Sequence, residues 1–224
     1  IIAKLYTSSG KEVNPNILSI DRYKNKTLFV STTLKGYRNV WLHDGKKLKL
    51  IINKKNRLTI KKAKFIDEEN FMFGTLGHEI ILYNTKDNYK TYNKHLESSA
   101  FTDMSLTVDK QFVLSSSESG RVTLSRVKTG EIVEIFESQN VDKIYNIDYK
   151  NGTLITAGQD RRVGVYMKNE KPYYIKSDFL VYSAALNSNA TMGVYSSNEN
   201  NHLQLFDVKS GKKGDKLIGH YATP

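Results

Sequence analysis

The ten residues Ala157-Gly158-Gln159-Asp160-Arg161-Arg162-Val163-Gly164-Val165-Tyr166 decide the fold class of this chain. They combine two small residues, a polar turn and a short strand whose apolar residues alternate up to a closing aromatic. In both directions from this stretch, comparable strands recur about every 40 residues, which indicates a repeated supersecondary unit. The closing positions of these strands are Tyr6, Trp41, Tyr83, Ser125, Tyr166 and Phe206.

Turn residues flank these strands on both sides. A pair such as Asp44-Gly45 or Thr129-Gly130 follows each closing position. We interpret these pairs as tight hairpin turns, because Gly, Asn and Asp tolerate the positive φ that such turns require. Two more β-rich runs fill each period, and no segment keeps a helical period of 3.6 residues. We therefore predict an all-β propeller of four-stranded antiparallel blades. The expected arrangement is a partial blade at 1–16 and blades at about 17–52, 60–94, 101–137, 144–176 and 181–218, in a single domain over 1–224.

The repeat resembles that of the WD40 family. Residues 157–166 are similar to its core pattern, Phe206-Asp207 to its aromatic-Asp ending, and Gly219-His220 to the pair that opens its next repeat. The resemblance implies a β-propeller that binds partners on its faces. Because an unclosed ring leaves a sheet edge unpaired, we expect a longer native protein with six to eight blades, most simply seven.

A narrower resemblance rests on residues 157–166 and on Asp178-Phe179-Leu180-Val181-Tyr182-Ser183. These stretches are similar to the WD40-like accessory proteins of periplasmic nitrate reductase systems. This resemblance implies a bacterial accessory protein whose partner is an enzyme subunit or a maturation factor.

Composition excludes several kinds of chemistry. The chain has no Cys, so disulfides, thiolate catalysis and Cys-based metal sites are excluded. No apolar run approaches the roughly 18 residues of a membrane span. The compartment is not determined by the sequence; the absence of Cys favours the periplasm, and the cytoplasm is the alternative.

Catalytic and metal-binding patterns are not found. The histidines His43, His78, His95, His202 and His220 do not stand at metal-ligand spacing, and no nucleophile elbow, phosphate loop or carboxylate pair is present. We expect a protein that is not an enzyme and uses no cofactor or metal. The alternative is a propeller hydrolase whose residues come from several blades to the mouth of the central channel.

The net charge of +11 is concentrated between Lys46 and Lys64, a window without Asp or Glu. Alternation along 47–52 places Leu48, Leu50 and Ile52 towards the next blade and leaves the lysines on the rim. We predict a basic rim that docks a protein partner with an acidic surface. Its residues are Lys47, Lys49, Lys54, Lys55, Arg57, Lys61 and Lys62.

Three other interpretations of the basic window stay open. Lysines on an outer strand protect a sheet edge, and an AT-rich coding sequence also enriches Lys. Binding of a polyanion, either nucleic acid or anionic lipid, is the functional alternative. The window contains no Tyr, Phe or Trp that would stack on bases, which argues against nucleic acid.

A second candidate surface comes from equivalent positions just before the third strand of each blade. If the blades follow one another around a disc, these residues form an arc on one face, where WD40-like proteins bind partners. The positions are Tyr37, Glu79, Arg121, Arg162 and His202. The simpler interpretation is that they are solvated residues at the starts of strands. Trp41 is expected to pack between blades, and the sequence does not determine the oligomeric state.

Overall fold

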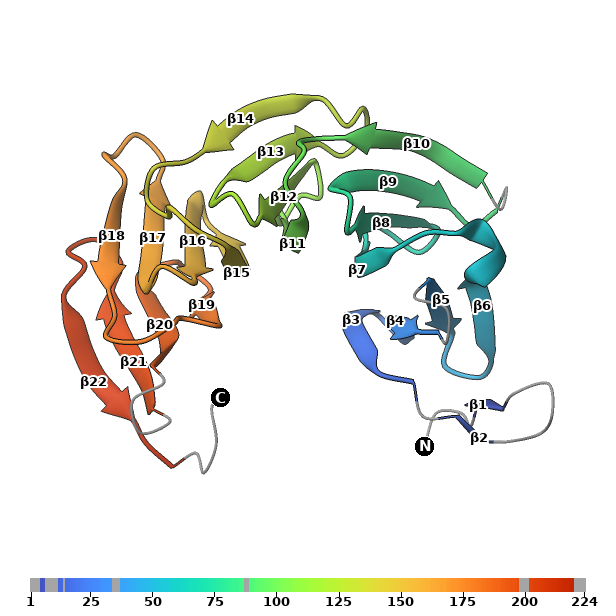
Figure 1. The fold of residues 1–224 in the computed structure, drawn as a ribbon, viewed down its shortest axis with the longest axis horizontal. Helices are drawn as coiled ribbons and strands as arrows, with labels where there is room; N and C mark the ends of the chain where they lie inside the picture. The colour runs from blue at the N-terminus through green and yellow to red at the C-terminus, as the bar shows by residue number, and fades with distance from the viewer. Residues whose placement is uncertain are drawn as a thin grey trace. The chain divides into compact units, whose positions relative to one another are not determined.

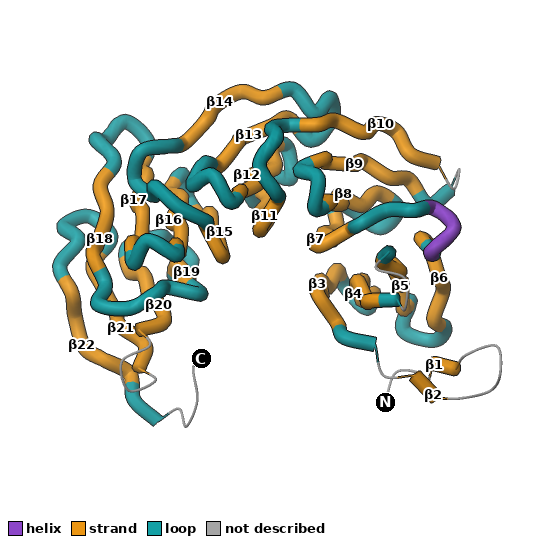
Figure 2. The backbone as a smooth tube through the Cα atoms, viewed as in Figure 1, coloured by secondary structure: helices purple, strands orange, loops and turns teal. Residues whose placement is uncertain are grey.

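The computed structural model describes residues 5–6, 12–13, 15–33, 37–86, 89–197 and 202–219. The chain divides into two compact units, residues 1–96 and 97–224. Each unit is built from antiparallel sheets whose strands are joined in sequence order (Figures 1 and 2). That residues 1–224 form one domain stays a prediction. So does the presence of seven blades in the full ring.

The first unit contains a two-stranded sheet and two four-stranded blades. Blade 1 has the order β3-β4-β5-β6, and blade 2 the order β7-β8-β9-β10. A short 3-10 turn, η1, joins the two blades. The elements are β1 (Leu5–Tyr6), β2 (Glu12–Val13), β3 (Ile17–Tyr23), β4 (Lys26–Thr32), β5 (Arg38–His43), β6 (Leu48–Ile52), η1 (Lys54–Asn56), β7 (Ile60–Phe65), β8 (Asn70–Thr75), β9 (Glu79–Asn84) and β10 (Tyr89–His95).

The second unit contains three blades of the same design: blade 3 (β11–β14), blade 4 (β15–β18) and blade 5 (β19–β22). The prediction of an all-β chain with five complete four-stranded blades is thus confirmed. The strands are β11 (Phe101–Leu106), β12 (Phe112–Ser117), β13 (Val122–Arg126), β14 (Ile132–Phe136), β15 (Ile144–Lys150), β16 (Thr153–Gly158), β17 (Arg162–Met167), β18 (Tyr173–Lys176), β19 (Ala184–Leu186), β20 (Met192–Ser197), β21 (His202–Asp207) and β22 (Lys213–Leu217).

Turns between the third and fourth strands form where Gly and Asp were expected. Gly45 and Gly211 have φ of 95° and 69°, a region that side chains with a Cβ rarely occupy. Asp44 accepts the backbone N–H of Lys47 at 2.7 Å and that of Lys46 at 2.9 Å, and these bonds lower the pKa of its carboxyl. The turn residues therefore fix the connection between the outer two strands. His220, assigned to the opening of a further repeat, lies outside the described residues.

The blades pack through apolar side chains of their middle strands. In the second unit, Val163 and Val165 of β17 are fully buried with Tyr195 and Phe206 of blade 5 in one core cluster. Burial of each such large side chain contributes on the order of 2 kcal/mol. Gly193 makes room for Phe206, since a Cβ at this position would lie 2.1 Å from the ring.

Trp41 makes a ring contact and a hydrogen bond inside blade 1, and its packing between blades stays a prediction. Its ring stacks on Phe29 with centroids 6.3 Å apart, and its Nε1 donates to the Ser31 hydroxyl at 2.9 Å. Both partners stand on β4, directly beside β5 in the sheet. The hydrogen bond forms because the polar indole nitrogen needs an acceptor when the ring is half-buried.

Polar side chains on the first strand of one blade bind the backbone of the first strand of the next. Asp103 on β11 accepts the N–H of Ile147 on β15 at 3.0 Å. Asn146 on β15 accepts the N–H of Ala184 on β19 at 2.9 Å. These bonds hold the first strands side by side although they belong to different sheets. The same contact joins Asp148 to Leu186 and, in the first unit, Asp21 to Phe65.

Candidate functional site

The predicted basic rim begins at β6, the last strand of blade 1. Lys47, the last residue of the turn that Asp44 holds, and Lys49 on the strand itself are both exposed. Beyond the strand, Asn53 accepts the N–H of Lys55 at 2.8 Å, and Asn56 accepts that of Asn53 at 2.9 Å. This pair of asparagine bonds shapes the η1 turn.

The η1 turn presents two further cations to solvent. Lys55 is exposed, and Arg57 is exposed with a φ of 53°. The side chain of Lys54, also assigned to the rim, lies outside the described residues. The described part of the rim thus consists of Lys47, Lys49, Lys55 and Arg57, which we call the rim cations.

The rim cations differ in their pairing from other lysines of the same unit. Lys64 lies 3.2 Å from Asp21, Lys86 lies 3.0 Å from Glu69, and both Lys24 and Lys26 reach Glu68. No rim cation has an ion pair with any described residue. Four positive side chains therefore stand exposed without a carboxylate partner in the described part of the chain.

Lys61 and Lys62 are placed differently from the rim cations. They stand on β7, the first strand of blade 2, next to a register shift between Ile60 and Lys62. Both are half-buried, and both interact with other residues of the chain. The structure therefore does not place them on the outer strand with the rim cations.

The expected alternation along β6 is correct at Ile52, which is buried, and wrong at Leu50 and Ile51. Leu50 is 39% exposed, whereas Ile51 packs against the core of the first unit. The cause is a β-bulge, since the register runs from Val40 opposite Ile52 to Trp41 opposite Leu50. An extra residue on one strand reverses the side-chain alternation beyond it.

The first two residues of the predicted face arc belong to the first unit. Tyr37 is half-buried just before β5, where its carbonyl accepts the Thr33 hydroxyl at 2.7 Å. Glu79 begins β9, and its carboxylate accepts bonds from Thr75 at 3.1 Å and Asn93 at 2.9 Å. Glu79 thus joins neighbouring strands within blade 2.

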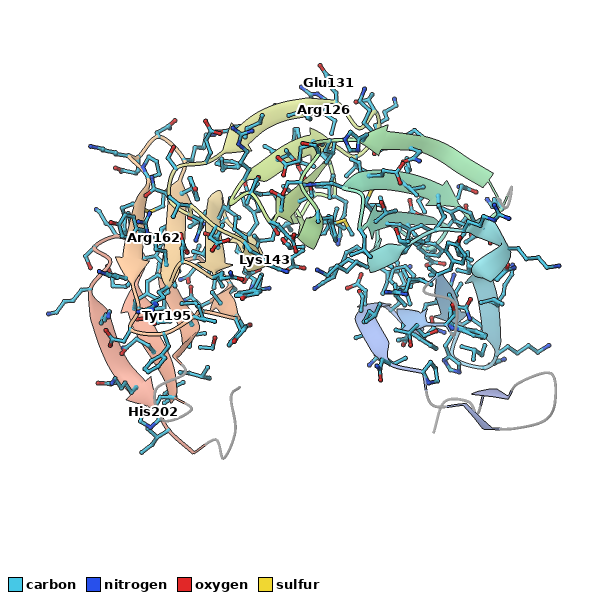
Figure 3. The ribbon with its side chains drawn as sticks, viewed as in Figure 1. Arg126, Glu131, Lys143, Arg162, Tyr195 and His202 are labelled. Carbon is cyan, nitrogen blue, oxygen red and sulfur yellow. The ribbon has the colours of Figure 1, made fainter. Side chains whose placement is uncertain are left out.

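The other three residues of the arc lie in the second unit, on successive blades. Arg121 pairs with Glu137 at 2.9 Å. Arg162 stacks over the Tyr174 ring, 4.2 Å from its centroid, so it bridges to the outer strand of its own blade. Figure 3 shows Arg162 on β17 and His202 at the start of β21. The Nδ1 of His202 is buried without a hydrogen-bond partner among the described residues.

The turn before Arg162 is held by a buried polar network around Asn140. The amide Nδ2 of Asn140 donates to Asp160 at 3.0 Å, and its oxygen accepts the hydroxyl of Thr156. That hydroxyl oxygen in turn accepts the N–H of Gly164 at 3.1 Å. Gly158 is required here, since a Cβ at this position would lie 2.3 Å from the Asn140 amide.

Exposed apolar residues in the loops between blades were missed by the sequence reasoning. Val141 is 68% exposed in the loop before β15, and Phe179 and Tyr182 are 44% and 40% exposed in the loop before β19. Tyr182 also contacts Tyr145, with ring centroids 5.0 Å apart. The signal was present in the stretch 178–183, where two aromatics stand in a short connection between strands. Aromatics of this kind are enriched at protein interfaces.

Carboxyl groups with a resolved pKa shift all move downwards, and their partners explain why. A hydrogen bond from Thr107, followed by one from the N–H of Gln111, lowers the pKa of Asp109. The ion pair with Lys24 lowers that of Glu68, and hydrogen bonds from Ser210 lower that of Asp207. These groups stabilise turns and inter-strand contacts.

The described histidines do not form part of any metal-ligand group. Among described residues, no three His, Asp or Glu side chains gather closely enough to hold a metal ion. His78 is fully buried in a turn with a φ of 56°, and His43 accepts the N–H of Gly45 at 3.3 Å. Nor does any helix in the described ranges have the length and apolarity to cross a membrane.

Comparison with known proteins adds a relationship of fold. No protein-family model and no curated protein sequence matches this chain. Among solved structures, a WD40-type propeller chain in the crystal structure of a mitotic checkpoint complex is similar, with a TM-score of 0.76 and 10% sequence identity. The similarity covers 96% of this chain and 69% of that chain. At this identity the likeness shows the fold alone, and this chain has the blades and the fold of a WD40-like β-propeller.

Proposed function

We propose that this chain is a non-catalytic scaffold that docks a protein with an acidic surface on its rim cations. WD40-like propellers commonly serve as interaction scaffolds, and the similar solved chain belongs to a protein complex. Both facts support a protein partner, and neither identifies it.

One observation supports the inference that the partner has an acidic surface. Lys47, Lys49, Lys55 and Arg57 are exposed without ion pairs in the described part of the chain, beside lysines that have carboxylate partners. A carboxylate brought by a partner would form pairs worth about 0.2 to 1 kcal/mol each. Their larger effect is on the rate and orientation of encounter, because a charged patch steers an opposite one.

A narrower form of the proposal is an accessory protein in the bacterial periplasm that binds a redox-enzyme subunit or its maturation factor. It rests on the similarity of residues 157–166 and 178–183 alone. The rim cations are compatible with it, since they require only an acidic patch on that subunit.

The test uses two variants with the same change in net charge. The first replaces the four rim cations with Glu. The matched control replaces four exposed lysines of the second unit, Lys128, Lys212, Lys213 and Lys216, with Glu. Partners are identified by crosslinking the intact protein in native lysate and sequencing the crosslinked peptides. Each purified partner is then titrated by biolayer interferometry.

The proposal expects a partner whose association rate falls at least tenfold in the rim variant and changes little in the control. Equal decreases of the association rate in both variants would show that the net charge of the protein, and not the position of the rim cations, determines that rate. A partner bound equally by all three proteins would refute the rim as its docking site.

The salt dependence of binding distinguishes a polyanion binder from a scaffold that docks a protein. If the rim cations neutralised four phosphates of duplex DNA, log K would fall against log salt with a slope of about −3.6. We expect no such binding to a 20-base-pair duplex or to phosphatidylserine vesicles. Tight binding with that slope, lost in the rim variant, would replace the scaffold with a polyanion binder.

A further inference from the structure

A small cavity opens between blades 3 and 4 of the second unit, far along the chain from the rim cations. It has a volume of about 220 Å³ and lies between β14 and the β17–β18 hairpin. Its apolar wall is formed by Ile135, Phe136, Tyr166 and Met167. Phe136 and Tyr166 meet edge to face with centroids 5.4 Å apart. Two aromatic rings in mutual contact thus fix one wall.

Carboxylates line the same cavity. Glu134 comes from β14 and Glu170 from the turn that follows β17, and both are exposed. Neither forms an ion pair or a side-chain hydrogen bond within the described residues. A third, Glu137, is already neutralised by Arg121 at 2.9 Å. The cavity therefore presents two unpaired negative charges beside an apolar and aromatic wall.

The neighbouring cations do not cancel these charges. Lys168 lines an adjoining cavity between blades 4 and 5, which shares Met167 and Glu170 with the first, but it forms no ion pair with Glu170 among the described residues, and Lys171 does not line either cavity. Arg126 lies 3.6 Å from Glu131, at the other end of β14. The unpaired charges of Glu134 and Glu170 remain available to a ligand.

The volume of the cavity limits the size of the group that it can bind. Pockets for small molecules measure about 300 to 1,000 Å³, so a cavity of this size accommodates a single side chain. An apolar side chain would leave the carboxylates unpaired. Arginine matches both features, because its methylene stem packs on apolar surface while its planar guanidinium forks to carboxylates and stacks on rings.

We propose that this cavity binds an arginine side chain of a partner polypeptide. The stem lies along Met167, the guanidinium faces the Phe136 and Tyr166 rings, and its N–H groups donate to Glu134 and Glu170. The site is independent of the rim cations, so either can fail without the other.

The test uses N-acetyl-arginine amide as the probe with the intact protein. Methyl groups of Ile135 and Met167 are labelled with ¹³C, since both line the cavity. We expect their signals to shift saturably with the probe. N-acetyl-citrulline amide has the same shape without charge, and N-acetyl-lysine amide keeps the charge without the planar fork. Both should bind at least five times more weakly.

Substitution then assigns the shifts to the carboxylates. In Glu134→Gln with Glu170→Gln, affinity for the arginine probe should fall at least tenfold while the methyl spectrum stays dispersed. The matched control is Asp178→Asn with Asp215→Asn, two exposed acids outside the cavity. Equal binding of citrulline, equal binding of lysine, no saturable shift, or unchanged affinity in the Gln variant would each overturn the proposal.

Discussion

Replacing Asn140 by Ala should destabilise the second unit more than any loss of an exposed polar residue. Asn140 is 3% exposed, and its amide connects Thr156 on β16 with Asp160 in the turn into β17. Truncation removes a donor to a carboxylate, a bond worth about 1.5 to 3 kcal/mol, and leaves the Thr156 hydroxyl without its acceptor at roughly 1 kcal/mol more. The expected loss is about 3 kcal/mol.

Urea denaturation followed by far-UV circular dichroism measures this loss. The midpoint should fall at an unchanged slope, and the thermal midpoint should drop by roughly 6 to 12 °C, since 1 kcal/mol corresponds to about 2 to 4 °C in a chain of this size. The matched control is Asn189→Ala, which truncates an exposed asparagine of the same unit and should cost well under 1 kcal/mol.

A second variant tests whether the chemistry, not the volume, matters. Asn140→Leu keeps about the same volume but can neither donate to Asp160 nor accept from Thr156. It should lose at least as much stability as Asn140→Ala. If Asn140→Ala loses less than 1 kcal/mol at an unchanged slope, the network does not stabilise the turn and the reasoning is refuted.

Three further outcomes are expected. Trp41→Phe removes the bond to Ser31 and should cost about 1 kcal/mol in urea denaturation, whereas Ser31→Ala should shift the tryptophan emission. Burial raises the pKa of Tyr166 and of Tyr195 to about 12, so their phenols stay neutral in the fold while the unfolded chain ionises near 10. Stability should therefore be full below pH 10 and fall by about 2 kcal/mol per tyrosine towards pH 12, which denaturation at stepped alkaline pH would detect. Asp103→Ala should lose about 2 kcal/mol and Asp103→Asn less, measured by thermal unfolding.

The strand pattern could be predicted from sequence because its causes are local. Alternation over four to seven residues and turn residues such as Gly45 and Gly211 act within a few positions of one another. The bulge at Ile51 could not be predicted, because it depends on how two strands pair across the sheet. One skipped residue then reversed the expected directions of Leu50 and Ile51.

The candidate sites were harder to predict from the sequence, since the ion pairing of a side chain and the shape of a cavity depend on residues far apart in the chain. Lys64 is paired by Asp21, which stands more than forty positions earlier, and no spacing rule separates it from Lys55. Likewise, Glu134 and Glu170 line one cavity only because two blades bring their strands together. Arg162 was identified by position, but its stack on Tyr174 follows from three-dimensional packing.

The hydrogen bonds between the first strands of neighbouring blades have a consequence for how such chains gain blades in evolution. Between blades 1 and 2, 3 and 4, and 4 and 5, the donor is a backbone N–H, which every residue except proline supplies, and the acceptor is one side chain such as Asp103 or Asn146. A duplicated blade can therefore be inserted after any blade that carries the acceptor, without a matching change in its neighbour. Tandem gene duplication can thus lengthen the array through a single retained residue, while the rest of each blade diverges.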